Sequence, residues 1–171
     1  MRTVIGLSVV LFVLCAYSGT AAYAAPVTDK HKQCIDGAIK EGSSAKTAAA
    51  LESAYQKYFS SEGMAALAAR SGWNTFDASR KAQWMEAARS FVINRVVPAA
   101  RKYSTIPIRY QREELARGGG VNIIGMVGKD TVVWRVITGQ CRLLDVSLSG
   151  VGSISDFIRS GMRSKERRSS R

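Results

Sequence analysis

The 171-residue sequence has few of the residues from which catalytic and metal sites are built. Its single histidine is His31, and it contains only three cysteines. A Ser-His-Asp mechanism needs a base, and a zinc site needs ligands at short spacing, such as two cysteines in C-x-x-C. His31 has no such partner. The adjacent carboxylates of Glu113 and Glu114 alternate sides on a predicted strand, so they do not face one substrate together. We therefore expect no enzyme activity, no metal and no cofactor.

Acidic residues are also scarce: the sequence has 13 aspartates and glutamates and 25 lysines and arginines. Much of the excess lies at the C-terminal end, where residues 163–171 are predicted to form a basic, disordered tail. Such a tail attracts the phosphates of nucleic acids or lipid headgroups. It lacks the interleaved aromatic residues that stack on bases, so we predict no nucleic-acid partner and favour an anionic membrane surface, a lipid headgroup or no partner. The cations of this end are Arg159, Arg163, Lys165, Arg167, Arg168 and Arg171.

The apolar run near the start of the chain, residues 4–16, is too short for a membrane anchor. It has roughly a dozen residues, whereas a spanning helix needs about 20. The run follows Arg2 and precedes Ala22-Tyr23-Ala24, which fits an A-x-A cleavage site. Cys15 follows Leu14 rather than a small residue, which disfavours lipidation. Residues 1–25 are therefore predicted to be a cleavable signal peptide.

The exported part suits a single domain, predicted over residues 26–162, that is long enough to bury one core. Two cysteines remain after cleavage, Cys34 and Cys141, and an oxidising compartment allows them to pair. The sequence does not show whether their Cβ atoms meet. A disulfide and two buried free thiols therefore stay equally open at this point.

Hydrophobic periodicity predicts helices followed by a sheet. Apolar residues at three-and-four spacing indicate helices over 46–59 and 62–70, and Asp77 caps a third helix that Pro98 should end or kink. Ser153 and Asp156 form a capping box for a last helix. Alternating patterns between these helices predict strands at residues 106–112, 121–127, 131–137 and 141–148. The predicted fold class is α+β, with N-terminal helices packed on a curved four-stranded antiparallel sheet, followed by a C-terminal helix.

Two groups of motifs resemble one known family. The first is Tyr58-Phe59-Ser60-Ser61-Glu62-Gly63-Met64-Ala65, followed by Ser71-Gly72-Trp73, Ala78-Ser79-Arg80 and Trp84. The second is Val133-Trp134-Arg135-Val136, Gly139, Arg142, Asp145-Val146 and Gly150-Val151-Gly152-Ser153. In this order they resemble the MlaC/Ttg2 family, the periplasmic phospholipid-binding components of lipid-transport and toluene-tolerance ABC systems. The chain departs from the family at Ser60, where an aspartate is usual, at Cys141, where a tryptophan is usual, and in its shorter C-terminal end.

The resemblance implies a periplasmic carrier that holds a phospholipid or other apolar ligand and meets inner- and outer-membrane lipid transport complexes. An apolar cleft between helices and sheet suffices for this, without any catalytic group. The alternative is a non-enzymatic accessory module with a fully packed core and a basic tail that binds a membrane or a partner. For each candidate pocket residue, a place in a filled core is the competing interpretation. The candidates are Met64, Leu67, Trp84, Phe91, Ile108, Tyr110, Ile124, Trp134 and Val136.

Overall fold

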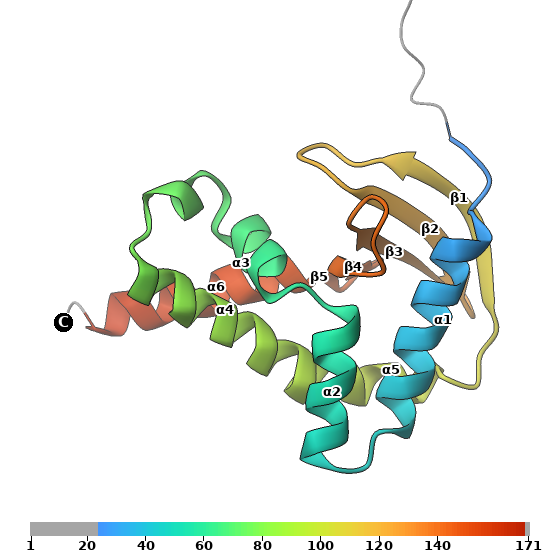
Figure 1. The fold of residues 1–171 in the computed structure, drawn as a ribbon, viewed down its shortest axis with the longest axis horizontal. Coiled ribbons are helices and arrows are strands. Elements are labelled where there is room, and N and C mark those ends of the chain that lie inside the picture. The colour runs from blue at the N-terminus through green and yellow to red at the C-terminus, as the bar shows by residue number, and fades with distance from the viewer. Residues whose placement is uncertain (1–23, 170–171) are drawn as a thin grey trace, which may run out of the picture.

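The computed structural model describes residues 24–169, so the predicted signal peptide lies outside the described residues except for its last two positions. The chain is α+β, as predicted, with helices first, then an antiparallel sheet, then a final helix (Figure 1). The helices of this range are α1 (Asp29–Ser44), α2 (Ala48–Tyr58), α3 (Ser61–Ala69), α4 (Ala78–Phe91), α5 (Val97–Tyr103) and α6 (Ile154–Ser169). The strands are β1 (Ile108–Leu115), β2 (Val121–Val127), β3 (Asp130–Val136), β4 (Leu143–Leu148) and β5 (Gly152–Ser153).

The sheet is a meander in which each strand pairs with the next one along the chain, in the order β1-β2-β3-β4-β5. It has five strands where the sequence predicted four, because the two residues of β5 pair with the end of β4 just before α6 begins. Directly opposed residues such as Ile123 and Trp134 share a face of the sheet. That face looks toward the helices.

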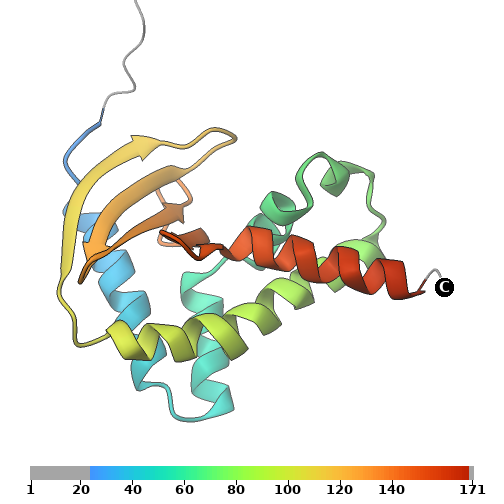
Figure 2. The same cartoon turned by 180° about the vertical axis from the view of Figure 1, so that it is seen from behind.

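The helices divide into two groups, which both views separate (Figures 1 and 2). The first group, α1, α2 and α5, lies on the side of the molecule where the sheet is, with α1 in front of the sheet and α2 packed on α1. The second, α3, α4 and α6, forms an arm that extends away from the sheet and carries the C-terminal end of the chain. We call this second group the helical arm.

Side-chain caps explain where most of the helices begin. The Thr47 hydroxyl accepts a hydrogen bond from the Ala50 N–H at the start of α2, and the Ser60 hydroxyl accepts one from the Gly63 N–H at the start of α3. Asp77 caps α4, as predicted. At Ser60 the serine supplies the same kind of acceptor that an aspartate would supply, so this departure from the family pattern keeps the cap.

Pro98 does not end its helix. The wide π-helical turn Val92–Val96 follows α4, and α5 continues directly from it with Pro98 in its first turn. The preceding turn is widened, since the Val97 N–H donates to the Val92 carbonyl five residues back, so the hydrogen-bond register changes just before the residue that has no N–H to donate. The irregularity therefore precedes Pro98, and the chain stays helical as far as Tyr103.

The predicted disorder of the C-terminal tail is wrong for residues 163–169, which continue α6 to Ser169. The helix extends because it has a neighbour along the arm. Met162 is buried, and the Glu166 carboxylate pairs with Arg80 of α4 at 2.7 Å. Charge alone predicted a solvated segment and missed these contacts.

Candidate functional site

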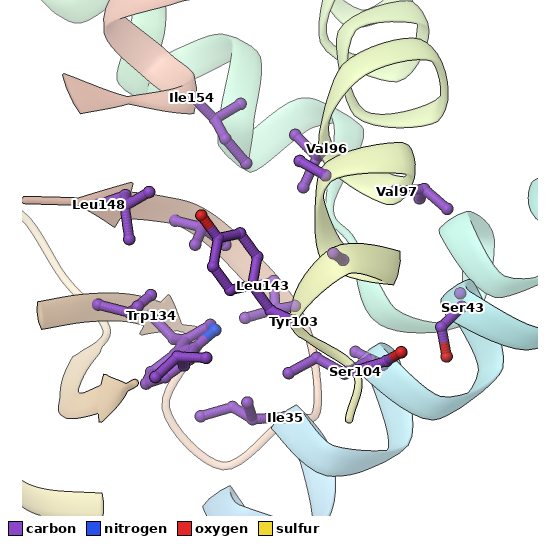
Figure 3. A pocket seen from close by; sticks show the side chains of 18 of the residues that line it. Ile35, Ser43, Val96, Val97, Tyr103, Ser104, Trp134, Leu143, Leu148 and Ile154 are labelled. Atoms are coloured by element: carbon purple, nitrogen blue, oxygen red, sulfur yellow. The ribbon is translucent and has the colours of Figure 1, made fainter. Parts of the chain in front are cut away.

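A large apolar cavity lies between the first group of helices and the sheet (Figure 3). Its volume is about 1040 Å³, and its walls come from α1, α2, α5 and the inner face of the strands. Only three of its lining residues are charged, Asp36, Lys40 and Arg95. All three are exposed, so the charges lie at the opening and the interior is apolar. Tyr103 projects from the end of α5 into this space, toward β4 (Figure 3).

Trp134 of β3 forms the base of the cavity on the sheet side. Its indole lies across β2 at Gly125, where a Cβ atom would meet Trp134 Cζ3 at 3.1 Å and the Arg109 carbonyl oxygen at 3.1 Å. A larger residue at position 125 would force the indole aside. The missing side chain of Gly125 thus lets an aromatic surface face the cavity.

A disulfide between Cys34 and Cys141 fastens α1 to the turn that joins β3 and β4, with the two Cα atoms 5.4 Å apart. The sequence left open whether these two cysteines are free thiols or paired, and in the structure they are paired. Ile35, the next residue along α1, is fully buried and lines the cavity. The disulfide holds this wall of the cavity against the sheet.

Two polar contacts fasten α1 to β1, at the β1 edge of the sheet. The Tyr110 hydroxyl donates to the Asp36 carboxylate at 2.8 Å, and His31 Nδ1 lies 2.7 Å from Glu113 Oε2. Burial, together with the Asp36 contact, raises the pKa of Tyr110, so its hydroxyl remains a donor at neutral pH. Burial opposes ionisation of Glu113, but hydrogen bonds from His31 and Thr28 outweigh it and leave the pKa of Glu113 below its ordinary value. His31 lies in the first turn of α1, which begins at Asp29.

Two motif residues, Arg142 just before β4 and Asp145 within it, anchor the strand to neighbouring helices. The Arg142 guanidinium donates to the carbonyl oxygens of Phe59, at 2.9 Å, and Gln56 at the C-terminal end of α2. Asp145 accepts hydrogen bonds from the backbone N–H and the hydroxyl of Ser155 in the first turn of α6. Burial raises the pKa of Asp145, while the Ser155 contacts act in the opposite direction. These contacts fix β4 as a wall of the cavity.

The structure places three of the nine predicted pocket residues in the cavity lining: Phe91, Ile108 and Trp134. Tyr110 lies beside the cavity, with its ring centroid 6.0 Å from that of Trp134, and holds α1. Val136 is fully buried in the core on the inner face of β3. Ile124 is opposite Val133 and therefore on the other face of the sheet from Ile123 and Trp134.

The remaining three predicted pocket residues, Met64, Leu67 and Trp84, belong to the helical arm and do not line the cavity. Met64 and Trp84 are buried in its packed core, and the Trp84 ring lies 5.6 Å from that of Phe76. The sequence analysis missed most of the lining, including everything that α1 and α5 contribute to it. The three-and-four recurrence of Ile35, Ala38, Ile39 and Gly42 was the available signal for α1.

Comparison with known proteins identifies the family. A family model described as MlaC protein matches residues 27–160. The chain belongs to the MlaC family. No curated protein matches it in sequence. Among solved structures, this MlaC-family chain is similar to the phospholipid-binding protein from Ralstonia solanacearum in complex with a phospholipid, with a TM-score of 0.56 and 12% identity over 76% of this chain and 81% of that one. At this identity the likeness shows a shared fold.

Other kinds of site find little support within residues 24–169. No group of three or more histidine, cysteine, aspartate or glutamate side chains there is placed to hold a metal ion. No helix in the same range is both long and apolar enough to cross a membrane. The apolar cavity between the helices and the sheet is the candidate functional site because of its size and lining.

Proposed function

We propose that this MlaC-family chain is a periplasmic carrier that holds the acyl part of a phospholipid, or another apolar ligand, between α1, α5 and the sheet. The cavity itself carries the proposal. Its volume of about 1040 Å³ is at the upper end of the ~300 to 1,000 Å³ typical of ligand pockets. Protein interiors are otherwise close-packed, so an apolar space of this size calls for an apolar occupant.

Acyl chains fit the chemistry of the lining. Each methylene group that leaves water for an apolar site contributes about 0.8 kcal/mol, so a lipid can be held without a catalytic or headgroup-specific residue. The polar part of the lipid would lie at the opening, where Asp36, Lys40 and Arg95 are exposed. Family membership and the phospholipid bound by the Ralstonia solanacearum protein support the same cargo.

The proposed role in transport follows from the family and the predicted signal peptide. An exported carrier exchanges lipid between inner- and outer-membrane complexes of an ABC-type system, and binds rather than transforms its cargo. The alternative, an accessory module with a fully packed core, fits the helical arm but not the open cavity.

The test is to export the full chain, purify the mature protein without detergent and analyse an organic extract by mass spectrometry. We expect phospholipid in near-stoichiometric amount, and uptake of a fluorescent acyl probe by delipidated protein that phospholipid competes away. An extract without lipid, together with no uptake of the probe, would contradict the carrier function.

A further inference from the structure

One wall of the cavity is built from a segment without acidic residues. Residues 87–112 contain no aspartate or glutamate, but they contain six arginines or lysines. The segment covers the end of α4, the π-helical turn, α5 and the start of β1. Its apolar residues, among them Phe91, Val96 and Tyr103, face the cavity.

The cations of this segment differ in their partners. Arg89 pairs with Glu52 and Glu86, Arg112 pairs with Glu114, and Arg101 and Arg109 donate to backbone carbonyl groups. Among residues 24–169, no ion-pair or hydrogen-bond partner is found for the side chains of Arg95 and Lys102, and both are exposed. They are seven residues apart, about two helical turns, so they project from the same side, with exposed Pro98 and Ala99 between them.

Apolar side chains extend this surface around the opening of the cavity. Ile106, Val151 and Phe157 are 36%, 58% and 44% exposed, and all three also line the cavity. A residue that lines a cavity and faces solvent lies at its mouth. Phe157 stacks on Phe91, with ring centroids 5.5 Å apart, and Phe91 is one turn before Arg95. The apolar and cationic parts of the rim are therefore contiguous.

We propose that this rim, Arg95, Lys102, Ile106, Val151 and Phe157, docks the mouth of the cavity on the surface of an anionic lipid bilayer. Apolar side chains flanked by cations are the pattern of interfacial binding, in which the apolar groups reach the acyl boundary and the cations meet phosphates. The proposal rests on the carrier function and adds the surface with which the carrier receives or delivers lipid.

A bilayer suits this surface because of the cargo. Moving a lipid through water exposes its acyl chains, and the cost rises with each methylene group. Apposing the apolar rim to the bilayer gives the chains a short path that excludes water. The absence of acidic residues over residues 87–112 removes the repulsion that anionic headgroups would otherwise meet along this part of the rim. Two carboxylates lie near the rest of the opening: Asp36 accepts a hydrogen bond from Tyr110, and Asp156, next to Phe157, pairs with Arg159.

The experiment measures flotation of the delipidated mature protein with vesicles of phosphatidylcholine, with and without phosphatidylglycerol. The test variant is Arg95→Gln/Lys102→Gln. The matched control is Arg117→Gln/Arg168→Gln, which removes the same charge from exposed positions in the β1–β2 turn and near the end of α6, both distant from α5 in each view (Figures 1 and 2). We expect binding to the anionic vesicles to fall about fivefold for each rim cation, and about 25-fold for the pair.

The control variant should keep most of its vesicle binding, and Val151→Asn should weaken vesicle binding while leaving the charge unchanged. Equal losses in the two charge variants would overturn the proposal, as would a wild-type protein that ignores anionic vesicles, the result expected if an acidic protein surface is the true partner. Uptake of the acyl probe in solution is measured in parallel. Probe uptake without vesicle binding overturns the docking surface alone, whereas absence of both lipid and probe binding overturns the carrier function.

Discussion

The helical arm and the cavity region are made from similar apolar residues, but only the arm is filled. In the arm, Met64, Ala65, Ala68 and Ala88 are fully buried, and the small alanines let α3, α4 and α6 approach closely. Around the cavity, residues such as Ile39, Val96 and Leu148 surround about 1040 Å³ of space. The difference lies in how far apart the elements are. The helices of the arm touch through small side chains, whereas α1 and α5 are separated from the sheet by the cavity.

The two regions also differ in how they are held together. The arm has a packed centre, and polar contacts such as the Arg80–Glu166 pair add to it. The cavity region has contacts at its edges instead: the Cys34–Cys141 disulfide, the Tyr110–Asp36 hydrogen bond and the His31–Glu113 pair. A fold that leaves its centre open loses packing there, so the links at its edges carry more of the stability.

The largest expected loss of stability comes from removing the disulfide at the edge of the cavity region. In the double variant Cys34→Ser/Cys141→Ser, the free energy of unfolding should fall by about 4 to 5 kcal/mol, because the disulfide closes a long loop of the unfolded chain. Urea denaturation checks this, with reduced wild-type protein as the control. Equal stability of the oxidised and reduced proteins would show that the link does not hold the region.

Shortening an apolar side chain should cost more stability in the packed arm than at the cavity. Met64→Ala creates a void in the packed arm and should cost about 2 to 5 kcal/mol of unfolding free energy. Ile39→Ala, at the cavity, should cost roughly 1 kcal/mol, because the side chain borders space that is already open. If both variants lost the same amount, the cavity would be as well packed as the arm.

Enlarging an alanine side chain should also destabilise the packed arm more than the cavity region. Ala68→Phe inserts a ring between packed helices and should destabilise by at least about 1 to 3 kcal/mol, whereas Ala38→Phe points a ring into the cavity and should change stability little. Thermal unfolding measures both. A large loss in Ala38→Phe would mean that α1 has no free space beside it.

The smallest effect is pH-dependent. Because the pKa of Glu113 lies below its ordinary value of 4.5 in the folded state, its contacts stabilise the fold above that pH and are lost as the pH falls through the lowered pKa. Glu113→Gln should therefore be less stable than wild type at pH 7 by about 1 to 2 kcal/mol. The gap should close in acid, and a gap that stays constant across the pH range would exclude this role.

Much of the fold could be predicted because local patterns decide it. The strand over residues 121–127 and the cap at Asp77 were located correctly, since alternation and capping depend on neighbours in sequence. The first helix was not predicted, because Gly37 and Gly42 lower the helix propensity of its sequence. In β2, the run Ile123-Ile124-Gly125 hides the alternation, so Ile124 was assigned to the wrong face.

The candidate site was harder to predict than the fold. A hydrophobic stripe shows that Met64 or Phe91 turns inward, but it does not show whether another side chain fills the space in front of it. That depends on how far apart whole elements lie. Met64 therefore lies in a packed core and Phe91 at an open cavity, although their sequence signals are alike.

The most direct test of the account is a fluorescence titration of an acyl probe into three delipidated proteins: wild type, Ala38→Phe and Ala49→Phe. Ala38 lines the cavity, whereas Ala49 is exposed on α2 and controls for the added ring. We predict that wild type and Ala49→Phe bind the probe alike, and that Ala38→Phe binds at least about tenfold more weakly while its unfolding free energy stays close to that of wild type. Equal binding by all three proteins would contradict the claim that the ligand occupies the space between α1, α5 and the sheet.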